Sequence, residues 1–198
     1  MRWNNLFDDL EGQLEHELGA EEVDLRGEEE RLRLGRLSLR DRLQALHEAA
    51  GPRDYSLRLN LRDGSVVRVR PLGFGRDWMS AELLGDTARR TQVVAPLDAV
   101  AGIILDREQV ASSLGARPGD GARGISARLG LAFVLRDLCR RRSPVDLVLP
   151  GGSLHGTIDR VGRDHCDVAT HEPGTVRRES SVLQYRVVPF SQLLLVKL

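Results

Sequence analysis

The stretch LVLPGGSLHGTIDRV, residues 147–161, decides the fold. Apolar residues alternate with other residues on both sides of the segment Gly151-Gly152-Ser153. Alternation with a period of two is typical of half-buried strands, and a glycine-rich pair between two such runs is typical of a hairpin turn. We therefore expect two antiparallel strands joined by a tight turn.

The same pattern occurs earlier in the chain. Residues 57–61, LRLNL, alternate in the same way and precede the turn-forming pair Asp63-Gly64. The Gly-Arg-Asp triplet at residues 162–164 matches an identical triplet at residues 75–77. A proline-containing turn then precedes the last apolar segment of each copy. These matches indicate an internal duplication in which a helix and five short strands occur twice.

Two helices are expected to precede the two sets of strands. The segment Ser38-Leu39-Arg40-Asp41 fits a capping box, and Gly51-Pro52 ends that helix. The second helix is predicted from about Ser126 to Arg141, with Leu129, Phe133, Val134 and Leu138 buried. The predicted domains are an acidic helical arm (residues 1–37), a helix with a first barrel (38–105), a linker (106–124) and a helix with a second barrel (125–198).

A helix followed by five short, strongly bent antiparallel strands is the plan of a small closed barrel. We therefore expect a mainly β protein with helices, an α+β fold of two five-stranded antiparallel barrels. The strand-glycine-strand pattern of residues 147–161, with Val188-Pro189-Phe190 near the end, resembles the Sm-like (LSm and Hfq) family. The resemblance covers residues 125–198 well and residues 38–105 less well.

The resemblance implies the barrel fold, RNA as a partner, and assembly through strand edges. Residues 161–165 hold Asp164 but no asparagine, so the base-binding pair of that family is incomplete. The C-terminal domain of ribosome-maturation factors shares the same strand rhythm. The layout of a helix and two barrels is also similar to an actinobacterial protein family.

Charge is distributed unevenly along the chain. The whole sequence has 29 basic and 29 acidic residues, whereas residues 106–143 contain eight basic and four acidic side chains, a net charge of +4. A basic segment suits phosphate groups, although cations at the end of a helix also stabilise the helix itself. No aromatic residue is interleaved with the arginines of residues 136–142, so base stacking on them is not expected. The candidate phosphate contacts are Arg123, Arg128, Arg140, Arg141 and Arg142, with Arg76 and Arg163 in the matching turns of the two copies.

These features predict a non-enzymatic, RNA-associated regulator or scaffold. The alternative is a protein-interaction adaptor of the transcription or translation machinery. For that alternative the candidate partner-binding residues form an apolar stripe at helical spacing in the acidic arm, namely Trp3, Phe7, Leu10 and Leu14.

Other classes of function find little support in the sequence. The Gly-x-Gly-x-x-Gly segment at residues 119–124 does not follow a strand directly, so we interpret it as a linker and expect no cofactor. His155, His165, Asp167 and His171 are interpreted as a polar strand face, with Cys166 in the core, and no metal is expected. No nucleophile motif occurs.

The chain contains no apolar run of membrane-spanning length, and we expect a cytoplasmic protein. The apolar last segment, residues 193–196, must pair within its barrel or with another chain. A homo-oligomer joined through strand edges is therefore an open alternative.

Overall fold

The computed structural model describes residues 22–50, 55–85, 91–115 and 125–198. Internal contacts divide the chain into two units, Met1–Ser38 and Leu39–Leu198. In the first unit a helix covers residues 22–35. Among the described residues, no helix has the length and apolar character needed to cross a membrane.

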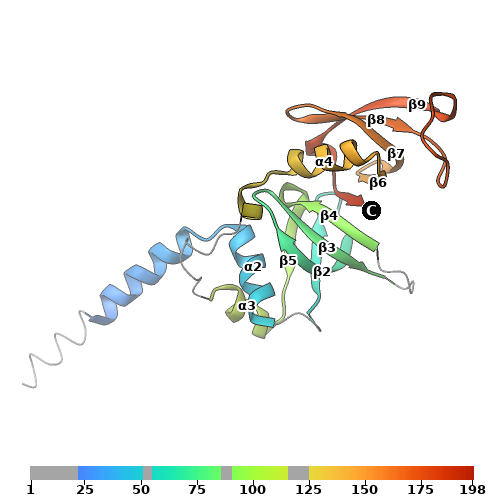
Figure 1. Cartoon of the computed structure of the whole chain (residues 1–198). Helices are drawn as coiled ribbons and strands as arrows, with labels where there is room; N and C mark the ends of the chain where they lie inside the picture. The colour runs from blue at the N-terminus through green and yellow to red at the C-terminus, as the bar shows by residue number, and fades with distance from the viewer. Residues whose placement is uncertain (1–21, 51–54, 86–90, 116–124) are drawn as a thin grey trace, which may run out of the picture. The chain divides into compact units, whose positions relative to one another are not determined.

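The second unit is built on one ten-stranded antiparallel sheet (Figure 1). Its strands follow the order β5-β1-β2-β3-β4-β10-β6-β7-β8-β9. The first five strands are β1 (Leu57–Leu61), β2 (Val66–Phe74), β3 (Trp78–Leu84), β4 (Thr91–Pro96) and β5 (Val100–Ile104). The other five are β6 (Pro144–Leu149), β7 (Gly152–Val161), β8 (His165–Thr170), β9 (Gln184–Pro189) and β10 (Leu195–Lys197).

The prediction of two closed five-stranded barrels is wrong, because the ten strands form one open sheet. The last strand, β10, pairs with β6 on one side and with β4 on the other. The free edge of β4 therefore pairs with β10, from the C-terminal half of the chain, and not with β5, which would close a barrel in the N-terminal half. Residues 193–196 were expected to pair either within a barrel or with another chain. They are buried within this chain, and β10 pairs with strands of the same chain on both sides.

The two halves of the sheet have the same strand order, with the last strand of each half beside its first. Strand β2 has a register shift around Leu72, and β7 has one around Asp159. The Gly75 N–H donates to the Trp78 carbonyl at 2.8 Å, and the Gly162 N–H donates to the His165 carbonyl at the same distance. The Gly-Arg-Asp triplets therefore form equivalent turns, as their sequence match predicts.

Three α-helices accompany the sheet within the described part of the second unit: α2 (Leu39–Ala50), α3 (Arg107–Ser113) and α4 (Leu131–Arg141). Helix α3 lies in the segment that was expected to be a linker, and Asp106 and Gln109 form a capping box at its start. Helix α4 begins later than predicted because Gly130 is its N-cap residue, and the Leu131 N–H donates to Asp77 Oδ1 at 2.7 Å.

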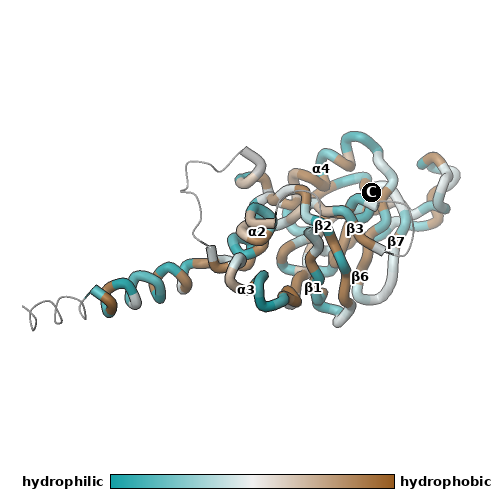
Figure 2. The backbone as a smooth tube through the Cα atoms, turned by 90° about the horizontal axis from the view of Figure 1, so that it is seen from below, coloured by the Kyte–Doolittle hydropathy of each residue, from teal (hydrophilic) through white to brown (hydrophobic). Residues whose placement is uncertain are grey.

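The late start of α4 also changes which of its residues are buried. Leu131, Leu135 and Leu138 are buried, whereas Phe133, which was predicted to be buried, is 53% exposed. The spacing of four and three is the usual one for a single helical face. Figure 2 shows hydrophobic and hydrophilic residues alternating along the helices and strands.

Two clusters of buried apolar side chains fill the second unit, one for each half of the sheet. They are not independent. Leu194 and Leu195, near the C-terminus, belong to the cluster of the first half, and Val94 belongs to the cluster of the second half. The pairing of β4 with β10 therefore joins the two cores as well as the two halves of the sheet.

Candidate nucleic-acid interface

An arginine-lined hollow of about 470 Å³ lies on the second half of the sheet, at the end of α4. We call it the arginine hollow. Its charged residues come from five segments: the end of α4, strand β7, strand β8, the loop after β8, and strand β9. They are the arginines Arg142, Arg160, Arg177 and Arg186 and the aspartates Asp159 and Asp167, and Tyr185 and Val187 complete the lining.

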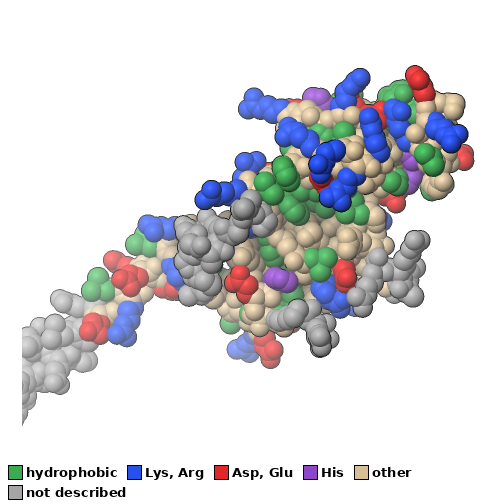
Figure 3. Space-filling view, in the orientation of Figure 1, with side chains coloured by type: hydrophobic (Ala, Val, Ile, Leu, Met, Phe, Trp, Pro, Cys, Tyr) green, Lys and Arg blue, Asp and Glu red, His purple; other side chains and the backbone are tan. Residues whose placement is uncertain are grey.

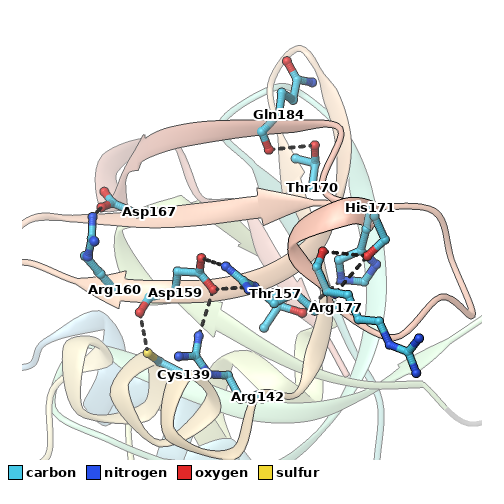
Figure 4. Close-up of polar contacts among 12 residues, drawn as sticks. Cys139, Arg142, Thr157, Asp159, Arg160, Asp167, Thr170, His171, Arg177 and Gln184 are labelled. Carbon is cyan, nitrogen blue, oxygen red and sulfur yellow. Dashed lines mark hydrogen bonds and ion pairs between the residues drawn. The ribbon is translucent and has the colours of Figure 1, made fainter.

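Asp159 is the centre of this arrangement (Figure 4). It occupies the register shift of β7, and a bulge of this kind re-aims a side chain out of the regular strand alternation. Its Oδ1 accepts from Arg142 Nη1 at 2.8 Å and from Arg177 Nε at 3.1 Å, and its Oδ2 accepts from Arg177 Nη2. One carboxylate therefore ties the end of α4 and the β8–β9 loop to β7.

The backbone at the end of α4 sets the position of Arg142. Arg142 adopts a left-handed conformation with φ of 51°, and its N–H donates to carbonyls of the last helical turn. A left-handed residue is a common helix ending, although glycine usually fills it. The Asp159 carboxylate also raises the pKa of the partner guanidinium, Arg177, through their hydrogen bonds. That arginine therefore stays charged.

The two other arginines of the hollow, Arg160 and Arg186, are exposed to solvent. Arg160 Nη1 lies 3.6 Å from Asp167 Oδ2 across the β7–β8 pair, and the Arg160 side chain is 84% exposed. Arg186 and Tyr185 are exposed on β9, where Tyr185 is 61% exposed. Four arginines and two aspartates give the hollow a net charge of +2. A concave surface with excess positive charge attracts anions, and an exposed aromatic ring can stack on a base.

Of the arginines predicted to contact phosphate, only Arg142 lines this hollow. Arg140 and Arg141 both pair with Asp137 on α4, at 2.5 Å and 2.7 Å. Their hydrogen bonds and charges lower the pKa of Asp137, the bond from Arg140 having the larger effect. Arg140 and Arg141 therefore share one carboxylate on the helix, which fits the interpretation as helix-end cations.

The other predicted arginines lie apart from the hollow. Arg76, in the β2–β3 turn, lies 3.3 Å from Asp77, and its N–H donates to the Leu129 carbonyl. Arg163, in the equivalent β7–β8 turn, lines a separate shallow hollow with Phe190. Arg128 is exposed at the end of a short 3-10 helix, Ile125–Arg128, and Arg123 lies outside the described residues.

In Figure 3 the basic side chains gather over the part of the surface formed by α4 and strands β7–β9. Sequence reasoning did not identify Arg160, Arg177, Arg186 or Tyr185 as members of a site. The tertiary structure brings Tyr185 and Arg142 to the same hollow, although they are 43 positions apart in the chain. Their proximity depends on the β8–β9 pairing and the bulge at Asp159, neither of which has a local sequence signal.

The predicted partner-binding stripe, Trp3, Phe7, Leu10 and Leu14, lies outside the described residues. The helix over residues 22–35 is described, and it carries exposed apolar side chains. Val23, Leu25 and Leu32 are each at least 60% exposed. Such side chains on a charged helix suit contact with another protein.

Two histidines in the second half of the sheet contact each other, and one of them also contacts an aspartate. His155 Nδ1 lies 2.6 Å from Asp146, and the His155 ring meets the His171 ring edge-on at 5.1 Å. His171 was expected on the outer face of a strand, but it follows β8 and is buried, with Nε2 2.9 Å from the Thr157 hydroxyl. Within the described ranges, no three His, Cys, Asp or Glu side chains are grouped to hold a metal ion. Cys166 is fully buried, as predicted.

Comparison with protein-family models, with curated proteins and with solved structures finds no match to this chain. The geometry described above is therefore the basis on which a function is proposed.

Proposed function

We propose that this protein is a non-enzymatic, cytoplasmic scaffold or regulator that binds single-stranded RNA through the arginine hollow. The observation that carries the proposal is the convergence of four arginines and an exposed tyrosine on one concave surface. Guanidinium groups suit phosphate oxygens, and an aromatic ring beside them suits an unpaired base.

The contacts within the hollow suggest a division of roles. Arg142 and Arg177 are held by Asp159, so they shape the site and contribute to its positive potential. Arg160 and Arg186 are exposed at the rim, where phosphate groups can approach. Tyr185 would contribute stacking that does not depend strongly on base identity. The proposal therefore predicts a salt-sensitive interaction with little sequence preference.

The test is the binding of labelled single-stranded RNA to the full chain at several salt concentrations. Each phosphate contact adds about 0.7 to the slope of log affinity against log salt for single strands. The double substitution Arg160→Gln with Arg186→Gln should lower that slope by about 1.4 and weaken binding at low salt. Equal binding by the variant and the wild type would remove the hollow from the proposal.

A matched control is available in the first half of the sheet. Arg58 and Arg68 are exposed arginines on β1 and β2, away from the hollow. The double substitution Arg58→Gln with Arg68→Gln changes the net charge by the same amount. It should leave the salt slope close to that of the wild type if the hollow, and not the overall charge, binds RNA.

The exposed apolar residues of the helix over residues 22–35 favour a second candidate function. In this alternative the N-terminal arm docks a protein of the transcription or translation machinery. Removal of residues 1–37 discriminates between the two functions, because internal contacts divide the chain after Ser38. RNA binding through the hollow should survive the deletion, whereas docking of a protein partner through the arm should be lost.

A further inference from the structure

Helices α2 and α3 pack against each other and leave a hollow of about 240 Å³ between them, in the first half of the second unit (Figure 1). We call it the α2–α3 hollow. Its two sides differ in chemistry. The α2 side is apolar and consists of Leu46, Ala49 and Ala50. The α3 side is polar and consists of the N-cap residue Asp106 with Glu108, Gln109 and Ser112. Tyr55, which precedes β1, completes the lining.

Hydrogen bonds at both ends of α3 hold the two sides of the hollow in place. At the start of α3, the Gln109 N–H donates to Asp106 Oδ1 at 2.8 Å, and the Asp106 N–H donates to Gln109 Oε1 at 3.1 Å. At its end, Arg42 Nη2 of α2 donates at 2.7 Å to the hydroxyl of Ser113, which is fully buried. The α2–α3 hollow is therefore preformed, and preorganisation lowers the cost of binding a ligand.

Both charged groups of the α2–α3 hollow are carboxylates. Asp106 and Glu108 are exposed, and neither has an ion-pair partner among the described residues. The capping contact uses Asp106 Oδ1, so Asp106 Oδ2 is left to accept from a ligand. The described lining contains no cation and has a net charge of −2. A concave surface with this charge attracts cations.

Tyr55 adds a buried hydroxyl that lacks a partner. The residue is 7% exposed, and within the described part of the chain its hydroxyl makes no hydrogen bond. Burial raises the pKa of this hydroxyl, and the negative charge of Asp106 raises it further, so the carboxylate lies near enough to act on it. Buried hydroxyl groups are nearly always hydrogen-bonded, because an unpaired one costs stability. The unpaired hydroxyl therefore indicates a place for a hydrogen-bond donor of a ligand, on the same side of the hollow as Asp106.

We propose that the α2–α3 hollow binds an aliphatic ammonium group, with the cation beside Asp106, Glu108 and the Tyr55 hydroxyl and the alkyl chain against α2. An ammonium group only donates hydrogen bonds, which suits two carboxylates and a hydroxyl oxygen. Methylene groups suit the apolar side. The hollow is smaller than the roughly 300 Å³ at which sites for larger ligands begin, so it suits a short chain. A free diamine and the end of a lysine side chain both supply this chemistry.

The first test titrates the full chain with n-butylamine, with 1,4-diaminobutane and with n-butanol, at fixed pH and ionic strength, and follows the backbone amides by NMR. Both amines should bind saturably, with dissociation constants on the order of 1 mM, as expected for five or six heavy atoms. The shifted amides should lie in α2 and α3. Butanol lacks the charge and should bind about tenfold more weakly or less. Equal binding of butanol, or no saturable shift with either amine, would overturn the proposal.

Substitutions on the polar side separate a cation site from a merely apolar hollow. Asp106→Asn removes one charge and keeps a good N-cap for α3, and Glu108→Gln removes the other charge. The double variant should bind both amines about tenfold more weakly or less. Its control is Asp98→Asn with Glu172→Gln, which removes the same charge at exposed positions outside the hollow. The control should bind like the wild type, and equal binding by the two double variants would contradict the proposed site.

Tyr55→Phe keeps the ring and removes only the hydroxyl. Because that hydroxyl is unpaired in the free protein, the variant should be at least as stable as the wild type in urea unfolding. Its affinity for the amines should nevertheless fall about threefold or more. Reduced stability with unchanged affinity would mean that the hydroxyl serves the fold and not a ligand, and would overturn the proposal. Tyr55 lies outside α3, so this variant keeps the test decisive if Asp106→Asn disturbs that helix.

A blocked tripeptide with lysine between two glycines distinguishes the two sources of the ammonium group. Tighter binding of the peptide than of either amine supports the site and assigns it to a lysine side chain of a protein. Tighter binding of 1,4-diaminobutane supports the site and assigns it to a free diamine. Failure of all three to bind would remove the site.

Discussion

At the scale of single residues, Asp159 has two opposite effects on the arginine hollow. Its carboxylate, 15% exposed, holds Arg142 and Arg177, and it also lowers the positive charge offered to an anion. Asp159→Asn should lower the free energy of unfolding by about 1–3 kcal/mol, because two charged hydrogen-bond donors lose their ionised acceptor. The same change should strengthen RNA binding at low salt, since the net charge of the hollow becomes more positive.

Urea unfolding and RNA titration of the same variant separate the two effects of Asp159→Asn. Asp98→Asn is the control, because Asp98 is exposed in the first half of the sheet and its replacement changes the total charge equally. It should change the free energy of unfolding by less than about 0.5 kcal/mol. Loss of RNA affinity in Asp159→Asn would show that the geometry held by this carboxylate matters more than its charge.

The two cysteines provide a second prediction at this scale. Burial raises the pKa of Cys166 to about 12, and the side chain is inaccessible in the folded protein. Cys139 is partly exposed, and its Sγ donates to the Asp159 carbonyl at 3.3 Å. Thiolate is the reactive form, so an alkylating reagent should label Cys139 first in native protein. Peptide mass spectrometry checks this, with equal labelling expected in urea.

At the scale of secondary structure, the close approach of β7 and β8 depends on Gly156. A Cβ added at Gly156 would lie 2.4 Å from the Ala169 carbonyl oxygen, which is backbone of the neighbouring strand and cannot rotate away. Gly156→Ala should therefore lower the free energy of unfolding by about 1–3 kcal/mol, as overpacking does in other proteins. Urea unfolding measures the change.

Gly151 in the β6–β7 turn is the matched control for Gly156. Nothing lies within 4 Å of a Cβ built there. Gly151→Ala should change the free energy of unfolding by less than about 0.5 kcal/mol. Equal effects of the two alanine substitutions would contradict the close strand approach as the reason for glycine in β7.

At the scale of the whole molecule, the junction of β4 with β10 makes the two halves of the sheet depend on each other. Leu194 is fully buried in the core of the first half, although it lies four residues from the C-terminus. Leu194→Ala should lower the free energy of unfolding by about 2–5 kcal/mol, because it leaves a cavity in that core. Unfolding should remain a single transition, since β10 also belongs to the sheet of the second half.

Circular dichroism and tryptophan fluorescence can follow the unfolding of Leu194→Ala together. Trp78 reports on the region between the halves, because its Nε1–H donates to the Leu129 carbonyl at 2.9 Å. Coincident transitions by both probes are expected. Two separated transitions, with only the first shifted by Leu194→Ala, would show that the halves unfold independently.

Local patterns in the sequence were sufficient to predict the strands, the hairpin turns and the repeat. The alternation in residues 57–61 and 147–149 predicted the strands β1 and β6, and the Gly-Arg-Asp triplets predicted the equivalent turns. These features depend on residues a few positions apart, so the sequence carries them directly. The late start of α4 was missed because the capping contact comes from Asp77, in a distant turn.

The sequence by itself determined the strands and the equivalence of the two halves. Only the tertiary structure decided that β10 pairs with β4, that the sheet stays open, and that Arg142, Arg177 and Tyr185 line one hollow. The physical reason is that a strand with a suitable apolar pattern can pair with more than one exposed strand edge. The choice among edges depends on contacts between residues far apart in the chain.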